Sequence, residues 1–175
     1  MLPDLTNLIL DADRLRLRSI TRDYIDPIFR EFTPEVATYM YPRPARERAE
    51  TEAFVAAAMQ EHQDGSSLTM VITLRETGEF LGCAGLHKLT TPRPEFGIWV
   101  KQSAQMHGYG REAIHALKRW ADQHLDYEYL VYPVDSRNIA SRKLPESFGA
   151  AIISQYDGTG GLGQELTLIK YRIER

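Results

Sequence analysis

The chain has 175 residues, which suits one domain spanning residues 1–175 with a sizeable core. It is 43% hydrophobic and 26% charged, as ordinary globular proteins are, and its net charge of −3 gives no general attraction to nucleic acid or to anionic membranes. Cys83 is the only cysteine, which excludes an intramolecular disulfide, and the five histidines lack zinc-site spacing, so we expect no metal.

The N-terminal part of the chain predicts a strand and two helices. Residues 1–4 lack the regions of a signal peptide and no 18-residue apolar run occurs, so we expect a cytoplasmic protein. Arginines alternate with leucines from 14 to 20, which predicts a half-buried strand with a solvated charged face. Thr21 is the predicted N-cap of a short helix through Phe32, and residues 45–63 predict a longer helix.

The middle of the chain has the period of two that strands show. Leu68–Leu74 and residues 80–89 predict a hairpin that turns near Gly78. Gly82 and Gly85 lie inside the second strand, where they indicate a bulge or the close approach of another chain or ligand. A further strand is predicted over residues 95–100.

A loop containing two glycines, residues 105–110, follows this strand and leads directly into a helix. Glycines let the backbone approach an anion, and the N-terminal end of a helix carries partial positive charge. This layout therefore predicts a phosphate site, although an ordinary strand-to-helix turn explains the nine residues 105–113 equally well. The predicted helix has an apolar stripe at helical spacing, made of Ala113, Leu117, Trp120, Ala121, His124 and Leu125.

The C-terminal part predicts three strands and one helix. A strand over 129–134 precedes a helix over 139–148, which Pro145 interrupts and Gly149 ends. Two strands over 150–156 and 165–173 follow, joined by a glycine-rich connection that leads into no helix. The whole order predicts an α+β, or mixed-sheet α/β, fold with helices on both faces.

Five segments in this order resemble the GNAT superfamily of N-acetyltransferases, in the branch of the RimJ/RimL type. Residues 105–110 fit its pyrophosphate loop, Q/R-x-x-G-x-G/A, and residues 138–143 fit its N-x-A-S-x-[RK] helix start. Residues 11–18, 77–86 and 95–100 are similar to its opening strand, its central hairpin and the strand that leads to the loop. The resemblance covers nearly the whole chain.

The resemblance implies a GNAT fold, acetyl-CoA as donor and a primary amine as acceptor. The fold has a mixed, mostly antiparallel sheet of about seven strands, splayed where the pantetheine arm of CoA lies. The amine attacks the thioester directly in a ternary complex. The implied CoA-binding residues are Ile98, Trp99, Val100, Gln105, Met106, His107, Gly108, Tyr109, Gly110, Arg111, Asn138 and Ser141. Many relatives carry a further glycine where this chain has Met106.

The catalytic groups that the resemblance implies are Glu95 and Ser141. Glu95 is the candidate general base, and its apolar surroundings predict a raised pKa; the alternative is a glutamate bonded to a neighbouring loop or to Arg93. Ser141 is the candidate proton donor to the CoA sulfur, and Asn138 binds the pantetheine arm; both also suit helix capping. His87 is either part of the acceptor cleft or a structural histidine.

Two other functions remain open at this point. A non-catalytic acyl-CoA-binding regulatory module has the same fold, and a nucleotide-binding module is disfavoured because no G-K-[ST] ending or repeated βαβ pattern occurs. The acceptor, a protein N-terminus or a small-molecule amine, is not encoded in a motif, because its pocket is expected from residues 21–63 and 156–165. Monomer and homodimer are both compatible with the sequence.

Overall fold

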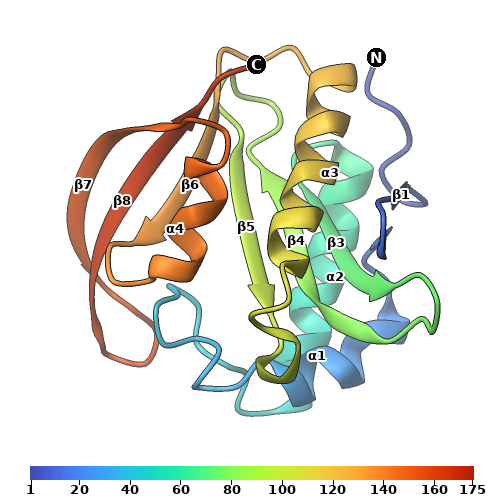
Figure 1. Cartoon of the computed structure of the whole chain (residues 1–175). Helices are drawn as coiled ribbons and strands as arrows, with labels where there is room; N and C mark the ends of the chain where they lie inside the picture. The colour runs from blue at the N-terminus through green and yellow to red at the C-terminus, as the bar shows by residue number, and fades with distance from the viewer.

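The computed structural model describes residues 1–175 and contains one sheet of eight strands (Figure 1). The strand order is β1-β2-β3-β4-β5-β6-β8-β7, and only the β5–β6 pair is parallel. The strands are β1 (Ile9–Asp11), β2 (Leu15–Ser19), β3 (Leu68–Leu74), β4 (Phe80–His87), β5 (Glu95–Val100), β6 (Leu130–Asp135), β7 (Ala151–Thr159) and β8 (Glu165–Ile173). The helices are α1 (Ile25–Glu31), α2 (Arg48–Asp64), α3 (Tyr109–His124) and α4 (Ile139–Glu146).

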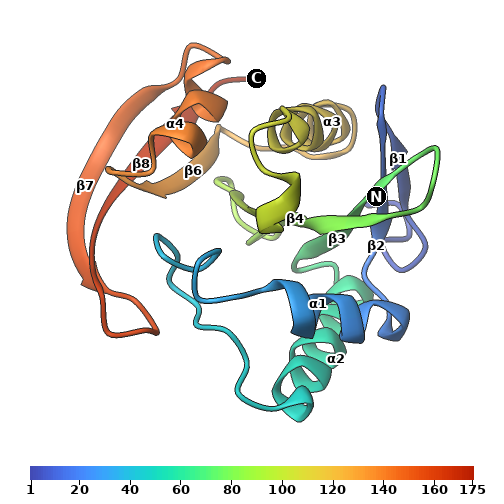
Figure 2. The same cartoon turned by 60° about the horizontal axis from the view of Figure 1, so that its bottom comes forward.

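Helices cover both faces of the sheet, as predicted. Figure 2 shows α3 and α4 on one face and α1 and α2 on the other. The larger core cluster includes Leu117 and Trp120 of α3, whereas the smaller one joins Ile28 and Val55 of the other two helices to Cys83 of β4. No helix of the structure is both long and apolar enough to cross a lipid bilayer.

The two strand glycines have the role that the sequence predicts. A Cβ atom at Gly82 would lie 2.1 Å from the carbonyl oxygen of Trp99 in β5, and one at Gly85 would lie 2.3 Å from the carbonyl oxygen of Leu68 in β3. The β3–β4 register shifts between Ile72 and Thr73, which is the predicted irregularity. Glycine therefore lets the three central strands approach closely here.

Several details differ from the sequence predictions. Thr21 is the N-cap residue of a short 3-10 helix, Arg22–Tyr24, that leads into α1, but its side chain makes no capping hydrogen bond. His124, the last residue of α3, is exposed, whereas the other five residues of the predicted stripe are buried. The sheet gains β1, an eighth strand that pairs with β2, and β7 continues through Asp157 to Thr159 into the predicted connection.

The parallel strands β5 and β6 diverge along their length. Their only paired residues are Glu95 and Val131, and the Val131 N–H donates to the carbonyl of Pro94 at 2.8 Å. Beyond this point the two strands form no further bridge, which confirms the splayed strands that the family resemblance implies. The opening lies directly before the glycine loop.

Candidate active site

Two residues of the glycine loop, residues 105–110, have a positive φ angle. Met106 has φ 66° and Gly108 has φ 78°, and α3 begins at the next residue, Tyr109. The left-handed conformation costs a non-glycine residue about 1–2 kcal/mol. Met106 therefore carries backbone strain within the glycine loop.

Six consecutive backbone N–H groups of this loop have no protein acceptor. They belong to residues 106–111, which span the loop and the first turn of α3, and no hydrogen bond is formed by any of them. The first N–H groups of a helix have no intrahelical partner, and the partial positive charge of the helix end adds to theirs. The loop is thus a ready site for an anion.

Arg14, which directly precedes β2, contacts the glycine loop and the first turn of α3. Its Nη1 donates to the carbonyl of His107 at 3.0 Å, and its Nε lies 2.9 Å from Oε2 of Glu112. Its guanidinium also lies 4.6 Å above the ring of Tyr109. The sequence pattern placed Arg14 on a solvated face, so this role was missed, because its partners lie more than 90 residues away along the chain.

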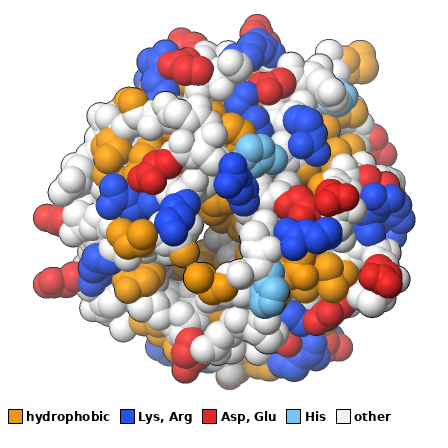
Figure 3. Space-filling model, in the orientation of Figure 1, with side chains coloured by type: hydrophobic (Ala, Val, Ile, Leu, Met, Phe, Trp, Pro, Cys, Tyr) orange, Lys and Arg blue, Asp and Glu red, His pale blue; other side chains and the backbone are white.

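The face that carries α3 and α4 has a hollow near its centre. Figure 3 shows Lys and Arg side chains around it, with hydrophobic side chains among them. Arg111 in the first turn of α3 and Lys143 on α4 are both exposed. Positive charge beside an opening with an apolar interior suits a ligand that has phosphate groups and an uncharged arm.

In β5 and at Pro94, which precedes it, every second residue points its backbone carbonyl away from β4 and toward the opening. Pro94 and Val100 point their carbonyls away from β4, where they accept from the Val131 N–H and from Nε2 of Gln105. By the alternation of a strand, Ile98 does the same. The carbonyl of Trp99 faces Gly82 in β4 instead.

The start of α4 lies next to β6 on the far side of the opening. Asn138 Oδ1 accepts from the Ser141 N–H at 3.2 Å, so Asn138 caps the helix. The Ser141 Oγ lies 2.7 Å from the hydroxyl of Tyr132, a buried residue of β6. Burial raises the pKa of Tyr132, so this hydroxyl stays protonated. The sequence did not single out Tyr132.

A cavity of about 720 Å³ lies on the opposite face, between α1, α2 and the strands β4 and β5. Phe32 and Trp99 form part of its apolar wall, with ring centroids 5.0 Å apart. Glu95, His87 and Gly97 lie together on its floor. The apolar wall of the cavity therefore lies beside β5, where β5 and β6 diverge.

Glu95 is bound by two lysines. Its Oε1 lies 2.8 Å from Nζ of Lys88 and 3.2 Å from Nζ of Lys170. Burial raises the pKa of Glu95, but the two ammonium groups outweigh burial and the pKa is lowered. The predicted raised pKa was therefore wrong. The alternative, a glutamate bonded to a neighbouring loop, is confirmed by Lys88, which follows β4, whereas Arg93 pairs with Glu128.

A model of the acetyltransferase (GNAT) domain matches residues 14–151, well over half of the chain. The chain belongs to the GNAT acetyltransferase family. As a member of this family it is an enzyme of the N-acetyltransferase class. A search of curated protein sequences found no match.

Solved structures show the same GNAT fold at low sequence identity. A putative ribosomal-protein-serine acetyltransferase from Vibrio cholerae has a TM-score of 0.79 at 21% identity, with 100% of each chain covered. The ribosomal L7/L12 alpha-N-protein acetyltransferase RimL in complex with coenzyme A has 0.85 at 16%, covering 95% of this chain and 98% of that one. A GCN5-related N-acetyltransferase from Brucella melitensis has 0.80 at 17%, covering 98% and 80%.

The GNAT structure divides the predicted site residues between two regions. The loop residues 105–111 lie at the N-terminal end of α3, beside the strand opening. Glu95 and Trp99 line the cavity on the other face, and Ser141 lies at the start of α4. The residue Cys83 is buried with a raised pKa, because burial disfavours its thiolate, and so it is a small apolar core residue, as predicted.

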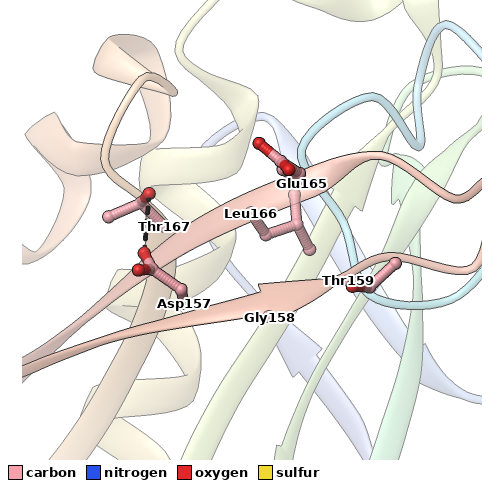
Figure 4. Close-up of a pocket in the computed structure, with 6 residues that line it drawn as sticks. All are labelled: Asp157, Gly158, Thr159, Glu165, Leu166 and Thr167. Carbon is pink, nitrogen blue, oxygen red and sulfur yellow. Dashed lines mark hydrogen bonds between the residues drawn. The ribbon is translucent and has the colours of Figure 1, made fainter.

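The connection between β7 and β8 does not line the cavity, contrary to the sequence prediction. It supports the cavity wall instead, because the Gly161 N–H donates to the carbonyl of Tyr41 at 2.7 Å and Nε2 of Gln164 donates to the carbonyl of Met40 at 3.2 Å. Figure 4 shows a separate pocket of about 460 Å³ on this hairpin. None of its six lining residues is basic, so it does not suit CoA phosphates.

Proposed function

We propose that this enzyme transfers an acetyl group from acetyl-CoA to a primary amine, by direct attack within a ternary complex. The observation that carries the proposal is the row of six N–H groups at residues 106–111, none of which has a protein acceptor. A pyrophosphate supplies the negative charge and the acceptor oxygens that such a row lacks. The opening between β5 and β6 follows directly and leads toward the cavity.

The rest of the CoA molecule would follow the strand opening. The main chain of Ile98 and the N–H of Val100 would pair with the amide groups of the pantetheine arm, whereas the Val100 carbonyl already accepts from Nε2 of Gln105. Trp99 contributes its side chain to the cavity. A free N–H on β5 would also stabilise the oxyanion that forms when the thioester carbonyl is attacked. One such donor contributes about 3 kcal/mol in other acyl-transfer enzymes.

Ser141 would protonate the departing CoA thiolate. Its hydroxyl is already paired with that of Tyr132 at 2.7 Å, so a proton given to the sulfur is replaced from a neighbour within hydrogen-bond distance. Asn138 orients this residue by capping the helix at the Ser141 N–H, and its amide NH2 would donate to the pantetheine arm.

Glu95 is the residue that the family resemblance implies as the general base. It remains an ionised carboxylate, and only one of its oxygens is held by the lysines. Its negative charge at the cavity floor also attracts an acceptor that arrives as an ammonium ion. The two roles differ in what they predict for the pH dependence of the Glu95→Gln variant.

A mass-spectrometric screen with isotope-labelled acetyl-CoA tests the proposed function. The acceptors form a broad panel of amines and peptides that includes benzylamine, spermidine and a peptide with an N-terminal serine. The serine peptide is included because similar structures include ribosomal-protein serine acetyltransferases. We expect transfer of the label to at least one amine. Stoichiometric CoA binding without transfer across a broad amine and peptide panel would instead identify a non-catalytic acyl-CoA-binding module.

A further inference from the structure

His87 lies at the end of β4, directly opposite Glu95 of β5. Its Nδ1 is 2.7 Å from the hydroxyl oxygen of Ser67, a residue that is only 5% exposed. This contact fixes the ring plane and engages one of the two ring nitrogens. The other nitrogen, Nε2, makes no hydrogen bond within the protein.

The free nitrogen is directed over Gly97, in the middle of β5. A Cβ atom at Gly97 would lie 2.9 Å from Nε2 of His87, so the imidazole occupies the space that a side chain would otherwise fill. The atom is not fully buried, since Nε1 of Trp120 is the only buried side-chain nitrogen or oxygen without a hydrogen-bond partner. Nε2 is therefore accessible from the cavity, next to the strand where the thioester carbonyl is expected.

The charged groups around His87 come from three elements. Glu61 on α2 and Glu95 on β5 raise its pKa, whereas Lys88, the next residue in the chain, lowers it. Burial is the largest influence and places the pKa below its usual 6.5. The imidazole is therefore neutral at pH 7 and has a lone pair available for a proton.

We propose that His87, through Nε2, is the general base that takes the proton from the acceptor amine, an assignment that rests on the proposed acetyl transfer. Ser67 accepts a hydrogen bond from Nδ1–H, which leaves the lone pair on Nε2. Nε2 takes one proton from the acceptor ammonium ion, and the lone pair that this frees on the nitrogen bonds to the thioester carbon. The nitrogen then releases its second proton to solvent. The carbon–sulfur bond then breaks, and CoA leaves as a thiolate that is protonated by Ser141 or water.

Glu95 has the supporting role in this arrangement. Because Lys88 and Lys170 stabilise its ionised form, it has little tendency to accept a proton. Its negative charge draws the acceptor ammonium toward the cavity floor and raises the pKa of the neighbouring imidazole. Glu95 thus attracts the acceptor ammonium ion, and His87 removes its proton.

The first test measures the tautomer of His87 by NMR in the full-length protein with isotope-labelled histidine. We expect Nδ1 to carry the proton and Nε2 to be unprotonated at about pH 7, with the Ser67→Ala variant losing this preference. A proton on Nε2 at that pH would overturn the proposal. This measurement needs no acceptor.

The second test compares kcat/KM of wild type and His87→Gln for the amine that the wild-type screen acetylates fastest. We expect a loss of about 100-fold or more, an unchanged KM for acetyl-CoA, and loss of the acid limb that a His87 pKa below 6.5 predicts for wild type. His124→Gln, at the exposed end of α3, is the matched control and should retain wild-type kinetics.

The two proposals fail in different ways. Wild-type protein that acetylates no amine would refute the proposed function, and the tautomer measurement would still decide whether Nε2 is free to accept a proton. Wild-type activity that His87→Gln retains with its acid limb would refute the base assignment alone. The fold of each variant is checked by its thermal unfolding.

Discussion

The Nε atom of Arg14 lies 2.9 Å from Oε2 of Glu112, and this ion pair joins the start of β2 to the first turn of α3. The same guanidinium donates to the carbonyl of His107, within the glycine loop. The pair also offsets the negative charge of Glu112, which would otherwise repel a pyrophosphate at this helix end. Arg14 is therefore expected to position the CoA loop without contacting the reacting atoms.

Arg14→Ala should weaken CoA binding about three- to tenfold, because the loop loses its outer support and Glu112 loses its counter-charge. Isothermal titration calorimetry measures this directly. Arg16→Ala is the matched control, since Arg16 pairs with Asp11 on the neighbouring strand and not with the loop. Equal loss of affinity in both variants would show that the effect is not specific to the loop.

Met106→Gly should stabilise the protein. The left-handed conformation at φ 66° costs methionine about 1–2 kcal/mol, and the greater freedom of glycine in the unfolded chain returns about 0.5–1 kcal/mol of this. The side chain is 90% exposed, so little packing is lost. We expect a gain of about 0.5–1 kcal/mol in urea unfolding, whereas Met106→Ala, which keeps the strain, should give none.

Glu95→Gln should raise the acceptor KM and leave the acetyl-CoA KM unchanged. Because the negative charge of Glu95 raises the pKa of His87, its removal should shift the acid limb of the pH–rate profile to lower pH. Disappearance of that limb would identify Glu95 itself as the base. A profile identical to that of wild type would mean that neither role belongs to Glu95.

Because His62 is buried, the free energy of unfolding should fall when the pH is lowered into the mildly acid range. Its Nε2 accepts from the Thr69 N–H at 2.9 Å, and burial lowers its pKa below 6.5. Between the folded pKa and 6.5 the unfolded state binds the extra proton, so the free energy of unfolding falls as pH drops below 6.5 and levels off below the folded pKa. His62→Gln retains an acceptor and should reduce this slope in urea unfolding at several pH values, whereas His124→Gln should not.

The sequence predicts the parts of the site that are continuous in the chain. The strand Glu95–Val100, the glycine loop and the cap at Asn138 have local signals, because turn residues, strand period and capping residues act over a few positions. The short strand Ile9–Asp11 has too few residues to show a period, so β1 was missed.

The rest of the site depends on contacts between distant residues. Glu95 was predicted to have a raised pKa because Lys170, 75 residues away, is not visible as its partner in the sequence. The cavity wall near Tyr41 is irregular and is held by Gly161 from the opposite end of the chain. Neither a propensity nor a periodicity reports such pairings, which tertiary packing alone creates.

Residues 106–111 are proposed to hold the pyrophosphate of CoA, and calorimetric CoA titration of two glycine variants tests this role most directly. Gly108 and Gly149 both have positive φ, 78° and 70°, so valine at either position imposes a similar backbone cost. Gly149 follows α4, away from the loop. We predict that Gly108→Val, while still folded, loses CoA binding and that Gly149→Val retains it. Unchanged CoA affinity in a folded Gly108→Val protein would contradict the account.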